Sequence, residues 1–159
     1  MDPGVCREHL RTLLREESEL LAELEELLVR ESRVLETSDV RALEATTCAR
    51  QQRMGALARI EEQRRSLCAL HGFSADRVGL EGLMAWCDGE GNLLSRLRVC
   101  AERAVRCRDL NDRNGIIVAA RLKRVAGMLD ALTGRPTRSD TYGPRGYCSI
   151  RPGRVLGAA

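Results

Sequence analysis

The chain has 159 residues, 31% of them charged and 43% hydrophobic, with a net charge of +3 and an aromatic content of only 3%. That length is one ordinary domain, whose core must be filled by leucine and alanine rather than by rings. Proline is confined to the two ends of the chain, at Pro3, Pro136, Pro144 and Pro152, which excludes most β-rich folds and favours long helices.

The first predicted helix covers about residues 4–36. Its leucines recur at i, i+3, i+4 and i+7, and Leu13, Leu20 and Leu27 repeat every seven residues. This spacing places one wide apolar stripe along the whole helix, which must be covered by another helix. A coiled-coil scaffold that dimerises through this stripe is one alternative to a fold within the chain.

The second predicted helix covers about residues 39–71. Ser38 is the predicted N-cap, with Asp39 in the first turn, where a carboxylate is favourable. Gly72 is the predicted residue after the helix C-cap, with Phe73 making the apolar contact that accompanies such an ending. Because only two or three residues separate the two long helices, we expect an antiparallel hairpin.

A short corner helix is predicted over residues 75–87, with Ser74 as its cap. A long last helix follows over residues 92–133, and its predicted seam alternates steps of four and three. The members of that seam are Leu94, Leu97, Ala101, Ala104, Arg108, Asn111, Gly115, Val118, Leu122, Val125, Leu129 and Leu132. The sequence therefore predicts an all-α helical domain over residues 1–134, coiled-coil-like in its packing, and a flexible tail over 135–159.

Charge is distributed unevenly along the chain. Residues 1–36 carry a net charge of −5, whereas residues 92–134 carry +5 and residues 135–159 carry +4. This polarity suits a bundle in which the acidic first helix lies near the basic last one. It also permits an arginine-rich protein that binds nucleic acid, although four aromatic residues leave little for base stacking and no helix-turn-helix spacing is evident.

Polar residues interrupt the predicted seam midway along the last helix, at Arg108, Asn111, Asn114 and Gly115. A polar group on a buried seam costs stability unless it is hydrogen-bonded, and one attested benefit is a fixed register or partner choice. Two interpretations follow from the periodicity. The interruption either fixes the register of the last helix or marks a hydrated kink where that helix leaves the bundle.

The last third of the chain contains two short motifs, Leu110-Asn-Asp-Arg-Asn-Gly115 and Tyr142-Gly-Pro-Arg-Gly146. Together they resemble the FlgN family of flagellar type III export chaperones. The run Leu110-Asn-Asp-Arg-Asn-Gly115 is similar to the family's (Leu/Met)-Asn-x-x-Asn-Gly element, and it is followed by an amphipathic helix. The run Tyr142-Gly-Pro-Arg-Gly146 is similar to the family's Tyr-Gly-x-x-Gly element. The acidic first helix, second helix, variable middle and long last helix match the family's architecture.

The resemblance implies a non-enzymatic chaperone that binds the C-terminal helical regions of the hook-filament junction proteins FlgK and FlgL. The implied cargo-binding residues are Asn111, Asn114, Gly115, Val118, Leu122, Val125, Leu129 and Leu132. The aliphatic members of this set are equally compatible with an intramolecular core. The resemblance further implies that Tyr142, Gly143 and Gly146 dock at the export gate protein FlhA.

The cysteines and histidines allow a second, less favoured site. Cys6 and His9 open the first helix while Cys68 and His71 close the second, so a hairpin brings two thiols and two imidazoles to one end, a legitimate zinc set. Against it, His9 falls on the polar side of the first helix. Buried structural thiols, including Cys100 and Cys107 on one face of the last helix, are the preferred interpretation.

Several classes are not expected. The chain lacks the ~20 consecutive apolar residues of a spanning helix and an apolar signal segment at its start, so we expect a cytoplasmic protein without membrane insertion. With two histidines and no glycine-rich phosphate loop, no nucleophile and base can be assigned, and we expect neither an enzyme nor a cofactor.

Overall fold

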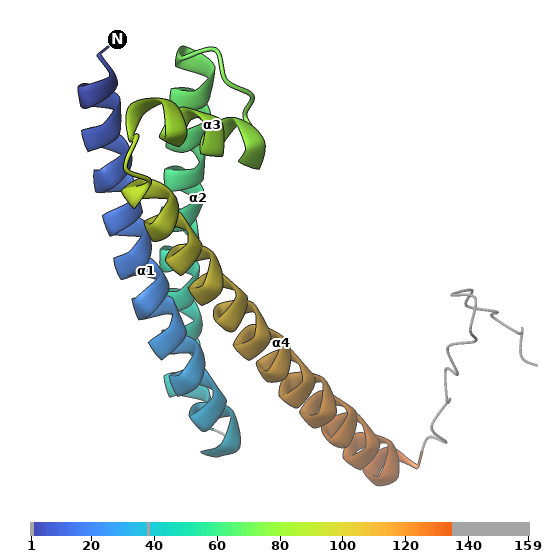
Figure 1. Cartoon of the computed structure of the whole chain (residues 1–159). Coiled ribbons are helices and arrows are strands. Elements are labelled where there is room, and N and C mark those ends of the chain that lie inside the picture. The colour runs from blue at the N-terminus through green and yellow to red at the C-terminus, as the bar shows by residue number, and fades with distance from the viewer. Residues whose placement is uncertain (1, 38, 135–159) are drawn as a thin grey trace, which may run out of the picture. The chain divides into compact units, whose positions relative to one another are not determined.

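The protein is described by a computed structural model over residues 2–37 and 39–134. Four helices follow in order: α1 (Pro3–Thr37), α2 (Val40–Leu70), α3 (Arg77–Cys87) and α4 (Asn92–Thr133), with no strand among these residues (Figure 1). The predicted all-α class is confirmed. The chain divides into two compact units, one ending at Ala120 and one beginning at Arg121. The predicted tail, residues 135–159, lies outside the described residues.

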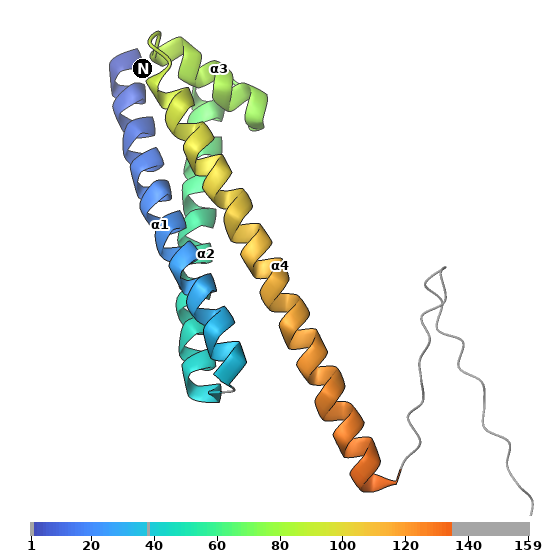
Figure 2. The ribbon, with the colours of Figure 1, turned by 60° about the horizontal axis from the view of Figure 1, so that its bottom comes forward.

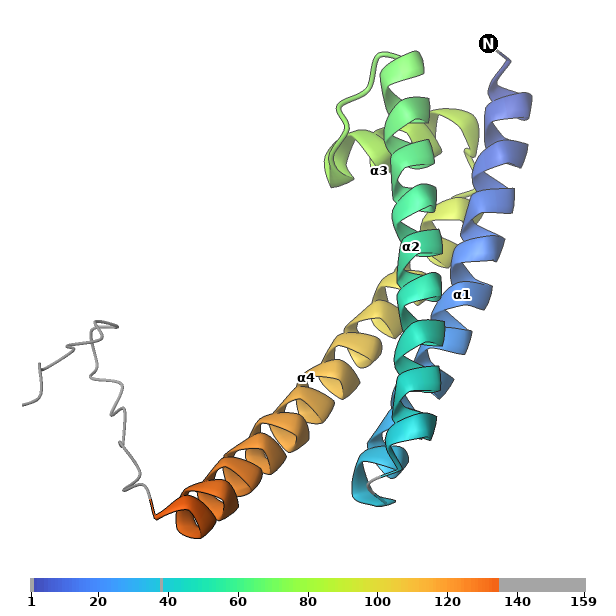
Figure 3. The ribbon, with the colours of Figure 1, turned by 180° about the vertical axis from the view of Figure 1, so that it is seen from behind.

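Helices α1 and α2 form the predicted antiparallel hairpin and lie side by side in every view (Figures 1 and 3). The apolar stripe of α1 is buried over nearly its full length, and Leu10, Leu14 and Leu28 are each no more than 2% exposed. Burying each such side chain contributes about 1.5–3 kcal/mol. The chain itself covers this stripe. The stripe is therefore not free to pair with a second copy, as the alternative of a dimeric coiled-coil scaffold requires.

The cap of α2 is Asp39 rather than the predicted Ser38. The Asp39 side chain accepts a hydrogen bond from the backbone N–H of Ala42 at 3.0 Å, which satisfies one of the free donors at the start of the helix. The other end follows the prediction: Gly72 has a φ of 76°, and the N–H of Phe73 donates to the Cys68 carbonyl at 2.9 Å. These contacts form a Schellman ending.

Helix α3 begins at Arg77 and is capped by Asp76, so the predicted start at residue 75 and cap at Ser74 are wrong. Asp76 accepts from the Gly79 N–H at 2.8 Å, while the Ser74 hydroxyl donates to Asp76 at 2.7 Å. These two hydrogen bonds, that from Ser74 first, lower the pKa of the Asp76 carboxyl. The prediction failed because serine supports the cap here instead of forming it.

The first turns of α4 lie beside α1 (Figure 2). The buried residues of α4 are Leu93, Cys100, Cys107 and Asn114, each seven positions after the last. The Cys100 thiol donates to the carbonyl oxygen of Leu14 at 3.7 Å, Cys107 to that of Leu21 at 3.6 Å, and the Asn114 amide to that of Leu28 at 2.9 Å. Both sets advance by seven in the same direction, so this part of α4 runs parallel to α1. We call these contacts the α1–α4 seam.

The α1–α4 seam uses a face of α4 that is rotated from the face predicted from the sequence. Leu94, Leu97 and Ala104 are only partly buried at its border, whereas Arg108 and Gly115 are exposed. The prediction counted leucines and alanines and gave cysteine little weight. Cysteine nevertheless behaves as a small buried hydrophobe, as the interpretation of Cys100 and Cys107 as structural thiols anticipated.

We predict that Gly79→Ala lowers the free energy of unfolding by about 2 kcal/mol, because an added Cβ would overlap the carbonyl oxygen of Ser74. The matched control is Gly55→Ala within α2, where nothing lies within 4 Å of an added Cβ. There alanine should stabilise by about 0.5–1 kcal/mol. Urea unfolding followed by circular dichroism measures both changes, and equal effects would contradict the assignment of Gly79.

A second prediction concerns the seam thiols. Burial, and next the Glu17 carboxylate, raise the pKa of the Cys100 thiol from its ordinary 9.0 to about 11, and burial also raises the pKa of Cys107. Unfolded thiols therefore lose protons before folded ones, so stability present below pH 9 should fall as pH rises from 9 toward 11. The slope is at most about 1.4 kcal/mol per pH unit for each thiol. A Cys100→Ala, Cys107→Ala variant should show a smaller slope; an unchanged slope would exclude these thiols as its source.

Candidate functional site

The asparagines of the (Leu/Met)-Asn-x-x-Asn-Gly element form a polar cluster at the end of the seam. Asn114, only 4% exposed, donates its amide hydrogens to the Leu28 carbonyl and to Glu31 Oε2, each at 2.9 Å. Glu31 is 5% exposed and forms an ion pair with Arg50 of α2 at 3.6 Å. Arg50 also donates to the side-chain oxygen of Asn111 at 2.6 Å. We call these four side chains the Asn114 cluster.

The Asn114 cluster ties three helices together, since Glu31 comes from α1, Arg50 from α2 and the two asparagines from α4. A single helix is assigned from Asn92 to Thr133, so α4 is unbroken near residues 111–115, and the cluster supports the interpretation of a fixed register. A hydrogen bond or ion pair forms only when its two partners stand opposite each other, whereas leucine contacts persist when one helix shifts along another. The Asn111 oxygen and the Asn114 amide nitrogen thus have partners within the chain, whereas the buried Asn114 oxygen has no hydrogen-bond partner among the described residues.

Beyond the cluster, the aliphatic residues of α4 are exposed. Val118 is 38% exposed, Leu122 66%, Val125 53%, Leu129 55% and Leu132 83%. Val118 lies in the first unit, and the other four lie in the second. Gly115 is exposed and has open space around an added Cβ, so packing within the chain gives no reason for its lack of a side chain.

In the second unit these exposed residues form one stripe, which we call the α4 stripe. It consists of Leu122, Val125, Met128, Leu129 and Leu132; Met128, 58% exposed, was missed by the predicted seam although its spacing fits the same face. At about 100° per residue the five side chains span roughly 120° of the helix surface and about 15 Å along its axis. Tyr142, Gly143 and Gly146 lie outside the described residues.

The proposed zinc set does not assemble. Cys6 and Cys68 are buried at 1% exposure, but His9 is exposed and the His71 ring packs on Trp86 with centroids 5.2 Å apart. Over residues 2–37 and 39–134, no group of three or more potential ligands is arranged to hold a metal. Burial raises the pKa of both Cys6 and Cys68, which keeps these thiols protonated. The sequence missed Cys87, whose thiol hydrogen-bonds with Cys6.

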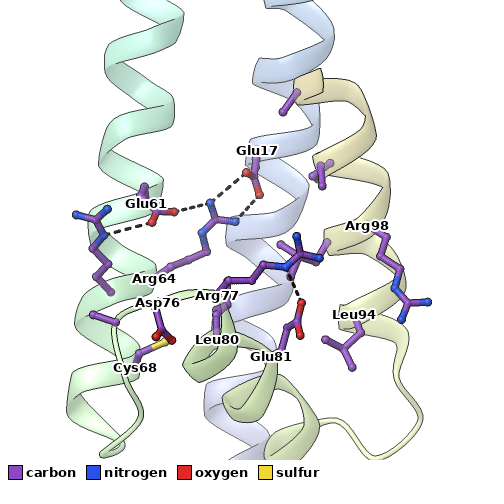
Figure 4. A pocket seen from close by; sticks show the side chains of 16 residues that line it. Glu17, Glu61, Arg64, Cys68, Asp76, Arg77, Leu80, Glu81, Leu94 and Arg98 are labelled. Carbon is purple, nitrogen blue, oxygen red and sulfur yellow. Dashed lines mark hydrogen bonds and ion pairs between the residues drawn. The ribbon is translucent and has the colours of Figure 1, made fainter. Parts of the chain in front are cut away.

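A pocket of about 560 Å³ lies where α2, α3 and α4 meet above α1. Figure 4 shows Arg64 reaching from α2 toward Glu17 of α1. Arg64, only 9% exposed, donates to both Glu17 oxygens at 2.7 and 3.1 Å and to Glu61 at 2.8 Å. Glu81 is paired with Arg77 at 2.8 Å.

The carboxylates of this pocket are paired within the chain, and the Arg64–Glu17 pair joins α2 to α1. Each of its carboxylates accepts hydrogen bonds, Glu17, Glu61 and Glu81 from arginines and Asp76 from Ser74 and Gly79. Removing one partner of the Arg64–Glu17 pair would leave an uncompensated buried charge. Sequence periodicity gave no signal for the pocket, because its lining comes from four separate helices.

No helix among the described residues is long and apolar enough to cross a bilayer. What the structure presents is an all-α protein whose first unit buries its own stripes and whose second unit leaves one exposed. Exposed aliphatic residues grouped on one face are typical of proteins that bind other proteins.

Comparison with known families shows to which family of such protein-binding proteins the chain belongs. The family model described as FlgN protein matches residues 1–148, most of the chain. The chain therefore belongs to the FlgN family, a family of flagellar export chaperones. No curated protein and no solved structure matches it.

We predict that Asn114→Ala lowers the free energy of unfolding by about 2–3 kcal/mol, because it removes the buried amide that donates to the Leu28 carbonyl and to the Glu31 carboxylate. Asn111→Ala is the matched control: Asn111 is exposed, and its loss should cost no more than about 0.5 kcal/mol. Chemical denaturation of both variants tests this, and similar losses would show that the buried amide has no special role.

Proposed function

We propose that this chain binds the C-terminal helical regions of hook-filament junction proteins of the FlgK and FlgL type in the cytoplasm. It keeps them from assembling early and delivers them to the flagellar type III export apparatus. The observation that carries the proposal is the α4 stripe: five large aliphatic side chains exposed on one helix face in a member of an export chaperone family. An amphipathic cargo helix that lays its apolar face on this stripe removes both surfaces from water.

The predicted cargo-binding set divides into two roles in this proposal. Val118, Leu122, Val125, Leu129 and Leu132 are available to contact cargo because they are exposed. Asn111 and Asn114 act on cargo only indirectly, since both already bind partners within the chain. Gly115 has room around its Cα, which suits a partner that approaches the helix backbone closely.

Delivery is assigned to the second motif. Tyr142, with Gly143 and Gly146, is proposed to dock at the export gate protein FlhA. A single aromatic side chain supplies a large contact area for a brief, releasable interaction. This assignment is supported by the resemblance of the Tyr-Gly-x-x-Gly element alone.

We expect Leu122→Asp with Leu129→Asp to weaken the complex with the C-terminal segment of a junction protein by at least about 100-fold. Each leucine loses about 1.5–3 kcal/mol of apolar burial, and every 1.4 kcal/mol is tenfold in affinity. Isothermal titration calorimetry measures the affinity. Both leucines are exposed, so helix content should not change.

Two further variants sharpen this test. Ile116→Asp places the same charge on an aliphatic residue that is 70% exposed but outside the α4 stripe, and it should leave affinity within about threefold. Tyr142→Ala should leave cargo affinity unchanged while export of the junction protein falls. Loss of cargo binding in Tyr142→Ala would contradict the division of roles, and no complex with the unmodified chain would contradict the proposed function itself.

A further inference from the structure

The two units of the chain carry opposite charge. Residues 1–120 contain 18 basic and 21 acidic residues, a net charge of −3, whereas residues 121–159 contain eight basic and two acidic residues, a net charge of +6. In the described part of that unit, residues 121–134, the charged residues are Arg121, Lys123, Arg124 and Asp130. A partner that docks there meets a net charge of +2. Complementary charge speeds such encounters and rejects partners of the same sign.

The two borders of the α4 stripe differ in chemistry. With about 100° per residue, the stripe is centred on Val125. Arg124 lies about 100° around the helix from Val125, on the same side as Met128. Ala126 lies about 100° from Val125 on the opposite side. Arg124 is exposed and makes no hydrogen bond or ion pair with any residue that the structure describes. Two other arginines of α4 are paired with Glu25 of α1, Arg103 at 3.4 Å and Arg106 at 3.1 Å.

From this asymmetry we infer that the helix received by the α4 stripe carries carboxylates along one border of its apolar face, the border that lies beside Arg124. The inference depends on the proposed function, because it specifies the chemistry of the same cargo. On the other border Ala126 adds no bulk, so the partner helix is able to lie close there. The arginine border thus fixes which way the partner helix is rolled about its own axis.

A nucleic acid fits this surface less well. Phosphates would pair with Arg124 but would leave five large aliphatic side chains uncovered, and α4 contains no aromatic residue on which a base could stack. An acidic amphipathic helix covers both the charge and the apolar area. The partner is therefore a protein helix in this inference, and nucleic acid binding is an outcome that the experiment must be able to detect.

The chain supplies a matched pair of substitutions for the test. Lys123 and Arg124 are adjacent, both exposed and both basic, but Lys123 lies about 160° from the centre of the stripe, on the opposite side of the helix. Arg124→Glu and Lys123→Glu change the net charge equally. Only the former places a carboxylate on the border of the stripe.

The probes are two synthetic amphipathic helices with the same leucine face, one bordered by glutamate and one by lysine, titrated into the full chain at 50 mM salt. We expect the glutamate-bordered helix to bind at least about tenfold more tightly, with an advantage that shrinks at high salt. Arg124→Glu should weaken its binding about three- to tenfold, and Lys123→Glu by less than about twofold. Equal binding of the two helices, or equal effects of the two substitutions, would overturn the inference.

The C-terminal segment of a junction protein, tested in parallel, separates this inference from the proposed function. If that segment binds and its affinity responds equally to both substitutions, the proposed function stands and the acidic border is wrong. If it fails to bind while the glutamate-bordered helix shows the expected pattern, the surface chemistry stands and the cargo is wrong. Displacement of the peptide by a short duplex RNA, with equal sensitivity to Lys123→Glu and Arg124→Glu, would favour nucleic acid and overturn the inference.

Discussion

The α1–α4 seam is the constraint on which the rest of the structure depends. Cys100, Cys107 and Asn114 are small enough for α4 to lie close to α1, and each donates a hydrogen bond to a backbone carbonyl of α1. Their equal spacing of seven residues keeps the same face of α4 against α1 for two heptads. Because the donors reach carbonyls that already take part in the α1 helix, the seam uses the second acceptor site of each carbonyl oxygen. The thiols serve this role only while protonated, which their burial ensures.

The position at which the seam ends also determines where an exposed apolar face can begin. Asn114 is the last buried residue of α4, and its cluster with Glu31, Arg50 and Asn111 replaces thiol contacts by stronger, more directional ones. The next residue in the heptad series, Arg121, is large and charged and opens the second unit. After Leu93, small residues make the α4 side of the seam, whereas the α4 stripe in the second unit consists of large apolar residues. One continuous amphipathic pattern in the sequence encodes these two different environments.

Periodicity and end signals were sufficient to predict the helices but not which faces they bury. The leucines of α1 and the ending at Gly72 allowed the hairpin to be predicted, because both depend on residues near in sequence. The N-caps Asp39 and Asp76 were predicted one or two residues too early. Serine and aspartate both favour the N-cap position, and local geometry decides which of them occupies it. The predicted seam was misplaced because the periodicity analysis counted cysteine as neither apolar nor polar. The Asn114 cluster and the pocket around Arg64 were beyond reach, as both require knowing which residues of α1 and α2 stand opposite each other.

The seam and the α4 stripe are coupled through the physics of helix formation. An isolated helix as short as residues 121–133 is marginal in water, because its first turn must be ordered before any hydrogen bond is gained. In this chain the preceding part of α4 is already ordered by the seam, so the helix continues into the second unit at the lower cost of propagation. The exposed stripe is thus presented in helical form before any partner arrives, which reduces the ordering entropy that binding must overcome. It follows that contacts made at Asn114 support a surface several turns away without touching whatever binds there.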